Sequence, residues 1–226
     1  MDAIPFRVDW RVATPWCPPF HGLHLDGLVA WAMLQEAISA GAPPGEYDSV
    51  LADLPFEKSD PGHDWVWKAS LLIPGDVRGY GRRFLNQHID PDEFIHRMAN
   101  GSVAGRQLGH VDQLRGPWKS SALWYTVQDV GTLTAYGVGD VERISELLER
   151  VTHLGKRTRL DHGRIEPDAD GILARVQEDP EALKRWRYRN LAEPSDAYAP
   201  VVGRLRPPYW LGTGTRTVWH PLPASV

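Results

Sequence analysis

The run from Gly155 to Arg164 places glycine and basic side chains close together, a combination suited to binding phosphate groups. Glycine adopts positive φ angles and lets a ligand approach the backbone, while arginine and backbone N–H groups donate hydrogen bonds to phosphate oxygens. A second interpretation is a helix end capped by Gly155 and followed by solvated basic residues. The residues that we expect to contact a polyanion here are Gly155, Lys156, Arg157, Arg159, His162, Gly163 and Arg164.

Three other segments, residues 78–83, 184–189 and 204–210, interleave arginine with aromatic rings. Such pairs suit single-stranded RNA, because arginine contacts phosphate while splayed bases stack on the rings. The glycines of the first segment predict a mobile finger. The second segment alternates like a strand, so it also fits a sheet edge with a buried aromatic face, and in the third segment core packing is the better interpretation for Tyr209 and Trp210. The RNA contacts predicted from these segments are Arg78, Tyr80, Arg82, Arg83, Arg187 and Arg189.

Two short clusters carry metal-ligand residue types at unsuitable spacing. The cluster Cys17, His21, His24 and Asp26 lacks the second Cys or His pair that is usual in zinc sites. Residues 166–171 resemble the start of a calcium loop, but Gln177 stands where a bidentate Glu is needed, so we interpret them as a turn. We therefore expect no metal and no cofactor.

Proton transfer to or from an RNA 2′-hydroxyl would need a positioned acid or base. The candidates are His21, His24, His162 and Tyr80, and their spacing reveals no paired base. We expect His162 to contact RNA rather than to catalyse, and we assign no catalytic residue.

Hydrophobic periodicity predicts the elements that must position these residues. Residues 4–12 alternate as a half-buried strand, and an apolar helix follows, with His24 or Asp26 as its cap and Gly41 at its end. Further strands are predicted at 65–73, 121–135, 163–165 and 172–176, a helix capped by Asp140 at 140–151, and a short helix at 91–99. We expect Pro74-Gly75 to end the second strand.

This order predicts an α+β fold, a ferredoxin-like (RRM-like) βαββαβ domain over residues 1–226. Residues 76–120 would form a long, glycine-rich, thumb-like insertion, and residues 177–226 a C-terminal β extension.

Composition indicates a globular protein, since 42% of the 226 residues are hydrophobic and 24% charged. No apolar run is long enough for a membrane span, the N-terminus does not resemble a signal peptide, and the single Cys17 fits a reducing cytoplasm. The net charge of −4 argues against a simple basic nucleic-acid binder. Residues 1–150 hold 13 basic and 20 acidic side chains, whereas residues 151–226 hold 12 and 9, which fits either a local basic face or ordinary surface variation.

Three motifs, in order, resemble the RAMP superfamily of CRISPR proteins. The segment Leu154-Gly155-Lys156-Arg157, followed by Gly163-Arg164-Ile165, resembles its glycine-rich loop, with Asp161 in place of one family glycine. Residues 24–32 and 206–210 are similar to the first helix and the C-terminal signature of the small RAMP subunit of type IV (Csf) CRISPR effector complexes.

That resemblance implies a subunit that holds the 5′ handle of a CRISPR RNA and caps a filament of backbone RAMP subunits. It implies further partners, namely target DNA near the protospacer-adjacent motif, the large-subunit-like protein and a helicase. Two alternatives stay open: a metal-independent endoribonuclease that processes repeat RNA, and a structural scaffold whose glycine loop only caps a helix.

Overall fold

The computed structural model describes residues 3–59, 64–87, 121–209 and 214–222. The chain forms two compact units, one within Met1–Gly79 and Gln128–Val226, the other within Tyr80–Val127. It passes from the first to the second within strand β2 (Ile73–Gln87) and returns within strand β3 (Ser121–Gly139).

An antiparallel sheet organises the larger unit. Its strand order is β2-β3-β1-β4, and β5 also pairs with β1. In the register of β1 and β3, Ile4 lies opposite Gly139 and Trp10 opposite Leu133. Besides β2 and β3, the strands are β1 (Ile4–Val12), β4 (Ile165–Glu166) and β5 (Arg175–Glu178). The protein therefore has a mixed α+β fold around an antiparallel sheet.

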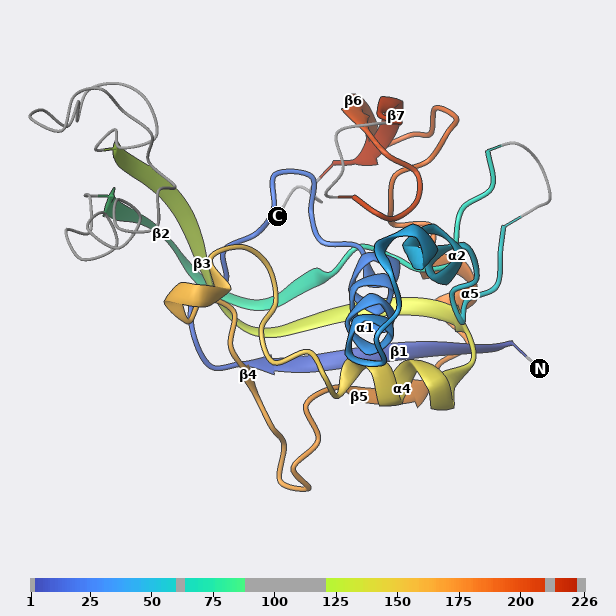
Figure 1. The fold of residues 1–226 in the computed structure, drawn as a ribbon. Helices are drawn as coiled ribbons and strands as arrows, with labels where there is room; N and C mark the ends of the chain where they lie inside the picture. The colour runs from blue at the N-terminus through green and yellow to red at the C-terminus, as the bar shows by residue number, and fades with distance from the viewer. Residues whose placement is uncertain (1–2, 60–63, 88–120, 210–213, 223–226) are drawn as a thin grey trace, which may run out of the picture. The chain divides into compact units, whose positions relative to one another are not determined.

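Two helices, α1 (Leu25–Ser39) and α4 (Val141–Leu148), pack against one another (Figure 1). Glu36 on α1 forms ion pairs with Arg143 and Arg150. The side chain of Asp140 accepts a hydrogen bond from the Arg143 N–H at 3.1 Å, which confirms the predicted cap. The remaining helices are short: η1 (Pro44–Glu46), α2 (Tyr47–Ala52), η2 (Thr158–Leu160) and α5 (Ala182–Arg185).

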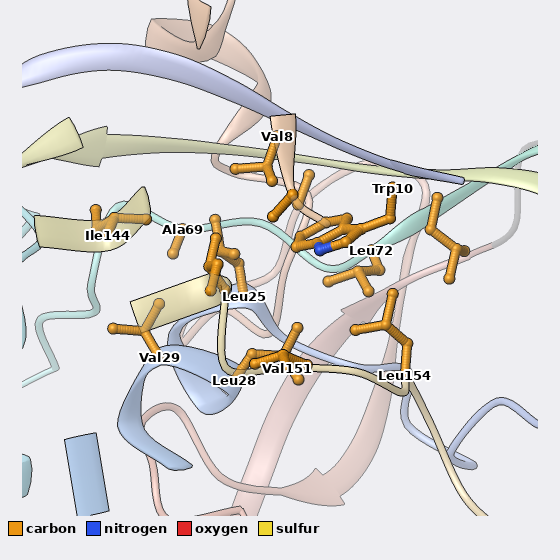
Figure 2. Close-up of a cluster of buried hydrophobic side chains, with 14 of the residues drawn as sticks. Val8, Trp10, Leu25, Leu28, Val29, Ala69, Leu72, Ile144, Val151 and Leu154 are labelled. Atoms are coloured by element: carbon orange, nitrogen blue, oxygen red, sulfur yellow. The ribbon is translucent and has the colours of Figure 1, made fainter. Parts of the chain in front are cut away.

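The main core lies between β1 and these helices. Alternate residues of β1 point into it, as the period of two predicted, and all four are buried: Phe6, Val8, Trp10 and Val12. Figure 2 shows Trp10 among Leu25, Leu72 and Leu154, while Val29 lies near Ile144. Burying each large apolar side chain stabilises the fold by about 1.5–3 kcal/mol.

A second, smaller cluster involves the C-terminal region. There β6 (Tyr198–Gly203) and β7 (Arg216–Pro221) form a two-stranded antiparallel sheet. The buried members of this second cluster are Val66, Val138, Trp186, Leu205 and Val218. The predicted C-terminal extension thus contains β structure together with α5.

The second strand was predicted at residues 65–73, and this position was wrong. Residues 65–72 form only isolated bridges, such as Lys58 with Trp67 and Ala69 with Gly137, and the long strand β2 starts at Ile73. Pro74 is compatible with a strand start because few ladder bonds are lost there. Residues 78–83 therefore belong to a strand rather than to a flexible finger. The helix predicted at 91–99, and most of the predicted insertion, lie outside the described residues.

The strand interpretation of residues 184–189 was also wrong. Helix α5 and a following turn occupy this segment, and the Trp186 N–H donates to the Ala182 carbonyl at 3.1 Å. The buried residues are Ala182, Trp186 and Arg189, which are spaced four and then three apart as on one face of a helix. The side chain of Arg189 therefore lies inside the protein, away from the surface where we predicted it to contact RNA.

The Arg189 guanidinium joins three separate stretches of chain. It donates to the carbonyls of Trp67, Ala69 and Leu205, to the Asp26 carboxylate at 3.0 Å, and to the Tyr209 hydroxyl at 2.8 Å. Burial opposes the charge, but Asp26 and Tyr209 together raise the pKa of Arg189 above its ordinary value. Arg189 thus ties α1 and residues 67–69 to the C-terminal region.

Tyr209 packs as the sequence indicated, with its ring centroid stacked 4.3 Å from that of His24. Burial raises the pKa of Tyr209 well above its ordinary value, so its hydroxyl stays protonated and donates to Asp26 at 3.0 Å. Burial, and then the nearby Arg189, lower the pKa of His24, which is neutral inside the fold.

We expect Arg189→Met to lower the free energy of unfolding by about 3–5 kcal/mol, because Asp26 would remain as a buried, uncompensated charge. The double variant Asp26→Leu with Arg189→Met should recover part of that loss. Arg7→Ala, which breaks a half-exposed ion pair with Asp9, should cost at most about 1 kcal/mol. Urea unfolding compares the variants, and equal losses for Arg189→Met and Arg7→Ala would contradict the central role of the buried network.

Candidate nucleic-acid interface

The glycine-rich loop runs from the end of α4 to β4, against the segment that follows β1. The Lys156 N–H donates to the Cys17 carbonyl at 2.8 Å, and the Leu154 N–H donates to the Gly163 carbonyl at 2.8 Å. A Cβ on Gly155 would lie 2.5 Å from the Cys17 carbonyl oxygen, and one on Gly163 would overlap the Leu154 carbonyl. The two glycines therefore permit close approach of the chain to itself, whereas the sequence predicted approach of a phosphate.

Two loop residues other than glycine also adopt the left-handed conformation. Arg157 has φ 63° and Asp161 has φ 61°, at the two ends of η2. Asp161 tolerates this conformation because its polar groups have local partners. Its carbonyl accepts a hydrogen bond from Thr14, and its carboxylate meets His153 and Arg164 at 3.2 Å each. The hydrogen bond from His153 and the proximity of Arg164 lower the pKa of Asp161.

The basic side chains of the loop divide between surface and interior. Lys156, Arg159 and Arg164 are exposed, and Arg157 is half-buried. His162 is buried, 8% exposed, with its Nδ1 3.0 Å from the Pro15 carbonyl oxygen. Four cationic side chains therefore lie at the surface of the loop, whereas the ring of His162, which we predicted to contact phosphate, lies mostly inside the protein.

A pocket of about 340 Å³ opens beside this loop. Gly155, Thr158 and His153 line one side of it, and Trp31 of α1 contributes an aromatic ring that is 41% exposed. Trp31 was missed by the sequence analysis, which treated the helix as apolar nearly all round. The sequence carries no clear signal for this exposure, because the apolar residues of α1 are spread around the helix rather than confined to one face.

The residues of the suspected metal cluster have separate structural roles. Cys17 is buried, and its backbone forms an isolated β-bridge with Gly155. The ring of His24 stacks on Tyr209, and Asp26 forms an ion pair with Arg189. His21 packs between the rings of Phe20 and His220. In the part of the chain that the structure describes, no three side chains of metal-ligand type are placed to hold an ion.

The smaller unit carries a second aromatic and basic surface. The side chain of Tyr80 is 77% exposed and that of Trp124 is 66% exposed. The ring centroids of Phe84 and Trp124 lie 4.7 Å apart. Arg82 and Arg83 are exposed on β2. Alternation along a strand places Tyr80, Arg82 and Phe84 on one face, and Arg83 on the other.

The remaining predicted contacts belong to the larger unit. Arg78 is exposed and lies 3.6 Å from Asp129 in an ion pair. Arg187 is exposed, with its guanidinium 5.4 Å from the Trp186 ring centroid. Neither is brought to the glycine-rich loop by a described contact.

Comparison with known families decides where this chain belongs. A family model for the CRISPR type IV associated protein Csf3 matches residues 4–221. The chain belongs to the Csf3 family. Its role therefore lies in a type IV CRISPR complex, which supplies partners for its surfaces. No curated protein matches the chain, and no helix in the described ranges has the length and apolar run that a bilayer crossing requires.

Two glycines with positive φ provide a test of the loop. Gly163 and Gly171 both adopt positive φ, but a Cβ on Gly171 meets nothing within 4 Å. We expect Gly171→Ala to destabilise the fold by about 1–2 kcal/mol through backbone strain alone. Gly163→Ala should cost about 2–5 kcal/mol, because steric overlap adds to that strain. Urea unfolding of both variants checks this, and equal losses would show that contact with Leu154 is not the constraint.

Proposed function

We propose that this chain is the RNA-binding subunit of a type IV CRISPR ribonucleoprotein and holds the 5′ handle of the CRISPR RNA. The observation that carries the proposal is the group of surface cations on the loop, Lys156, Arg157, Arg159 and Arg164, beside the pocket that contains Trp31. Cations of this kind contact phosphates, and an exposed indole accepts a stacked base.

The arrangement of elements supports assignment to the RAMP superfamily. Helix α1 lies in the connection from β1 to β2, and α4 in the connection from β3 to β4. Together with the strand order β2-β3-β1-β4, this placement of the helices supports a ferredoxin-like βαββαβ fold. In this proposal the chain caps the filament of backbone RAMP subunits, next to the large-subunit-like protein, with target DNA near the protospacer-adjacent motif.

Binding without catalysis is the form of this proposal that the burial of two of the four candidate acids or bases, His24 and His162, favours. His24 and His162 are buried, and both ring nitrogens of His153 are engaged, by the Thr152 hydroxyl at 3.0 Å and by Asp161 at 3.2 Å. A general acid or base needs a ring nitrogen within hydrogen-bond reach of the reacting group. Incubation of repeat RNA with the protein in EDTA tests this form, since specific cleavage would favour the endoribonuclease alternative.

The loop cations predict a defined loss of RNA binding. We expect Arg157→Ala with Arg159→Ala to weaken binding of the repeat-derived 5′ handle by about a hundredfold or more, because each lost charged hydrogen bond is worth about 1.5–3 kcal/mol. The slope of log affinity against log salt concentration should fall by about 1.4, or about 0.7 for each lost phosphate contact. Fluorescence anisotropy over a salt series measures both quantities.

A charge-matched control is the double variant Arg11→Ala with Arg175→Ala, which removes two exposed arginines that pair with Glu166 and Asp168. This control should retain the affinity and the salt slope. Equal weakening in both double variants would reduce the effect to net charge and favour the scaffold alternative.

The pocket predicts a separate effect. Trp31→Ala should weaken handle binding by about 1–3 kcal/mol, the usual contribution of one stacked base, with little change of the salt slope. Trp31→Phe should restore part of the affinity, since a smaller ring still stacks. Ile38→Ala is the control, because Ile38 is 43% exposed on the same helix and does not line the pocket. If Trp31→Ala binds the handle as tightly as the unchanged protein, the pocket does not hold a base.

A further inference from the structure

Two adjoining hollows share Asp53, Phe56 and Glu57. One has a volume of about 460 Å³ and reaches Met33 and Asp140, and the other has about 590 Å³ and reaches Trp67. Phe56 lines both hollows and Trp67 lines the second, and because both side chains are buried the hollows have partly apolar walls. We name this pair of hollows the Asp53 groove.

The Asp53 groove and the glycine-rich loop lie at opposite ends of β1. Gly139, which lines the groove, pairs with Ile4 at the start of the strand. At the other end of the strand Val12 pairs with Ile165, which directly follows the loop. Eight strand steps separate Ile4 from Val12, which corresponds to roughly 26 Å at about 3.3 Å per residue. An occupant of the groove is therefore distinct from an RNA segment held at the loop.

The charged side chains around the groove indicate which class of partner could occupy it. The two cations of the groove are already engaged, Arg143 by Glu36 and Glu146, and Lys58 over the rings of Trp65 and Trp67 at 4.8 and 5.0 Å. Glu57 pairs with Lys68 at 2.6 Å, whereas among the residues that the structure describes none forms an ion pair with the exposed Asp53. An unpaired carboxylate repels phosphate and attracts a basic side chain.

We propose that the Asp53 groove docks a segment of another protein subunit of the type IV complex. The segment carries a Lys or Arg that meets Asp53, between two large apolar side chains that fill the two hollows. Apolar anchors in pockets supply most of the affinity of such contacts, and the central ion pair fixes the register. The proposal depends on membership of a type IV CRISPR complex and not on RNA binding at the loop.

Site-specific photocrosslinking in the assembled complex tests the occupant. Position 58, which lines the groove and leaves Asp53 in place, is replaced by p-benzoylphenylalanine, and position 48, on α2 and outside both hollows, receives the same group as the control. We expect position 58 to crosslink a different protein subunit at least tenfold more than position 48. The crosslinked peptide, identified by mass spectrometry, should contain a basic residue between two large apolar ones. A crosslink to RNA, a crosslink to a second copy of this chain, or equal yields at the two positions would overturn the proposal.

Charge reversal gives a second measurement with a separate readout. Asp53→Lys should lower retention of this chain in the purified complex at least tenfold relative to Asp48→Lys, while the affinity of the isolated chain for the handle RNA stays within twofold. Unchanged retention of Asp53→Lys would overturn the docking proposal. Unchanged handle affinity in the Arg157 and Arg159 double variant would overturn the proposed function and leave the docking proposal unaffected, so the two failures are distinguishable.

Discussion

The buried Arg189 guanidinium is the interaction on which the arrangement of the larger unit depends. Its hydrogen bonds reach Asp26 on α1, the carbonyls of Trp67 and Ala69, and Leu205 in the C-terminal region. Because an unpaired charge at this depth would cost several kcal/mol, these segments must meet at the same point or the fold loses stability. The same α1 presents Trp31 near the glycine-rich loop, so the buried network also helps to fix the helix that lines the candidate RNA site.

Charges of opposite sign gather at the two ends of β1. Exposed Lys156, Arg159 and Arg164 belong to the loop at one end, and the exposed Asp53 to the groove at the other. Such a separation lets an acidic protein hold a polyanion, because phosphate contacts act within about one Debye length, roughly 8 Å at physiological salt. The net charge of the whole chain therefore says little about which partner each end accepts.

The glycine-rich loop illustrates how one sequence feature serves two purposes. Gly155 and Gly163 are required by the chain itself, since a Cβ would meet Cys17 or Leu154. The side chains of Lys156 and Arg159, between these glycines, are exposed and are not needed for the close approach of the chain. The cations, rather than the glycines, therefore carry the functional argument.

The sequence by itself determined β1, the Asp140 cap and the family, because alternation, capping and short motifs are local properties of the chain. It could not determine that Arg189 is buried or that Trp31 is exposed beside the loop, since both depend on elements far apart in the sequence. Only the tertiary structure decided these points. Burial of a charge depends on whether distant carbonyls and a carboxylate converge on it, and period alone carries no information about that convergence.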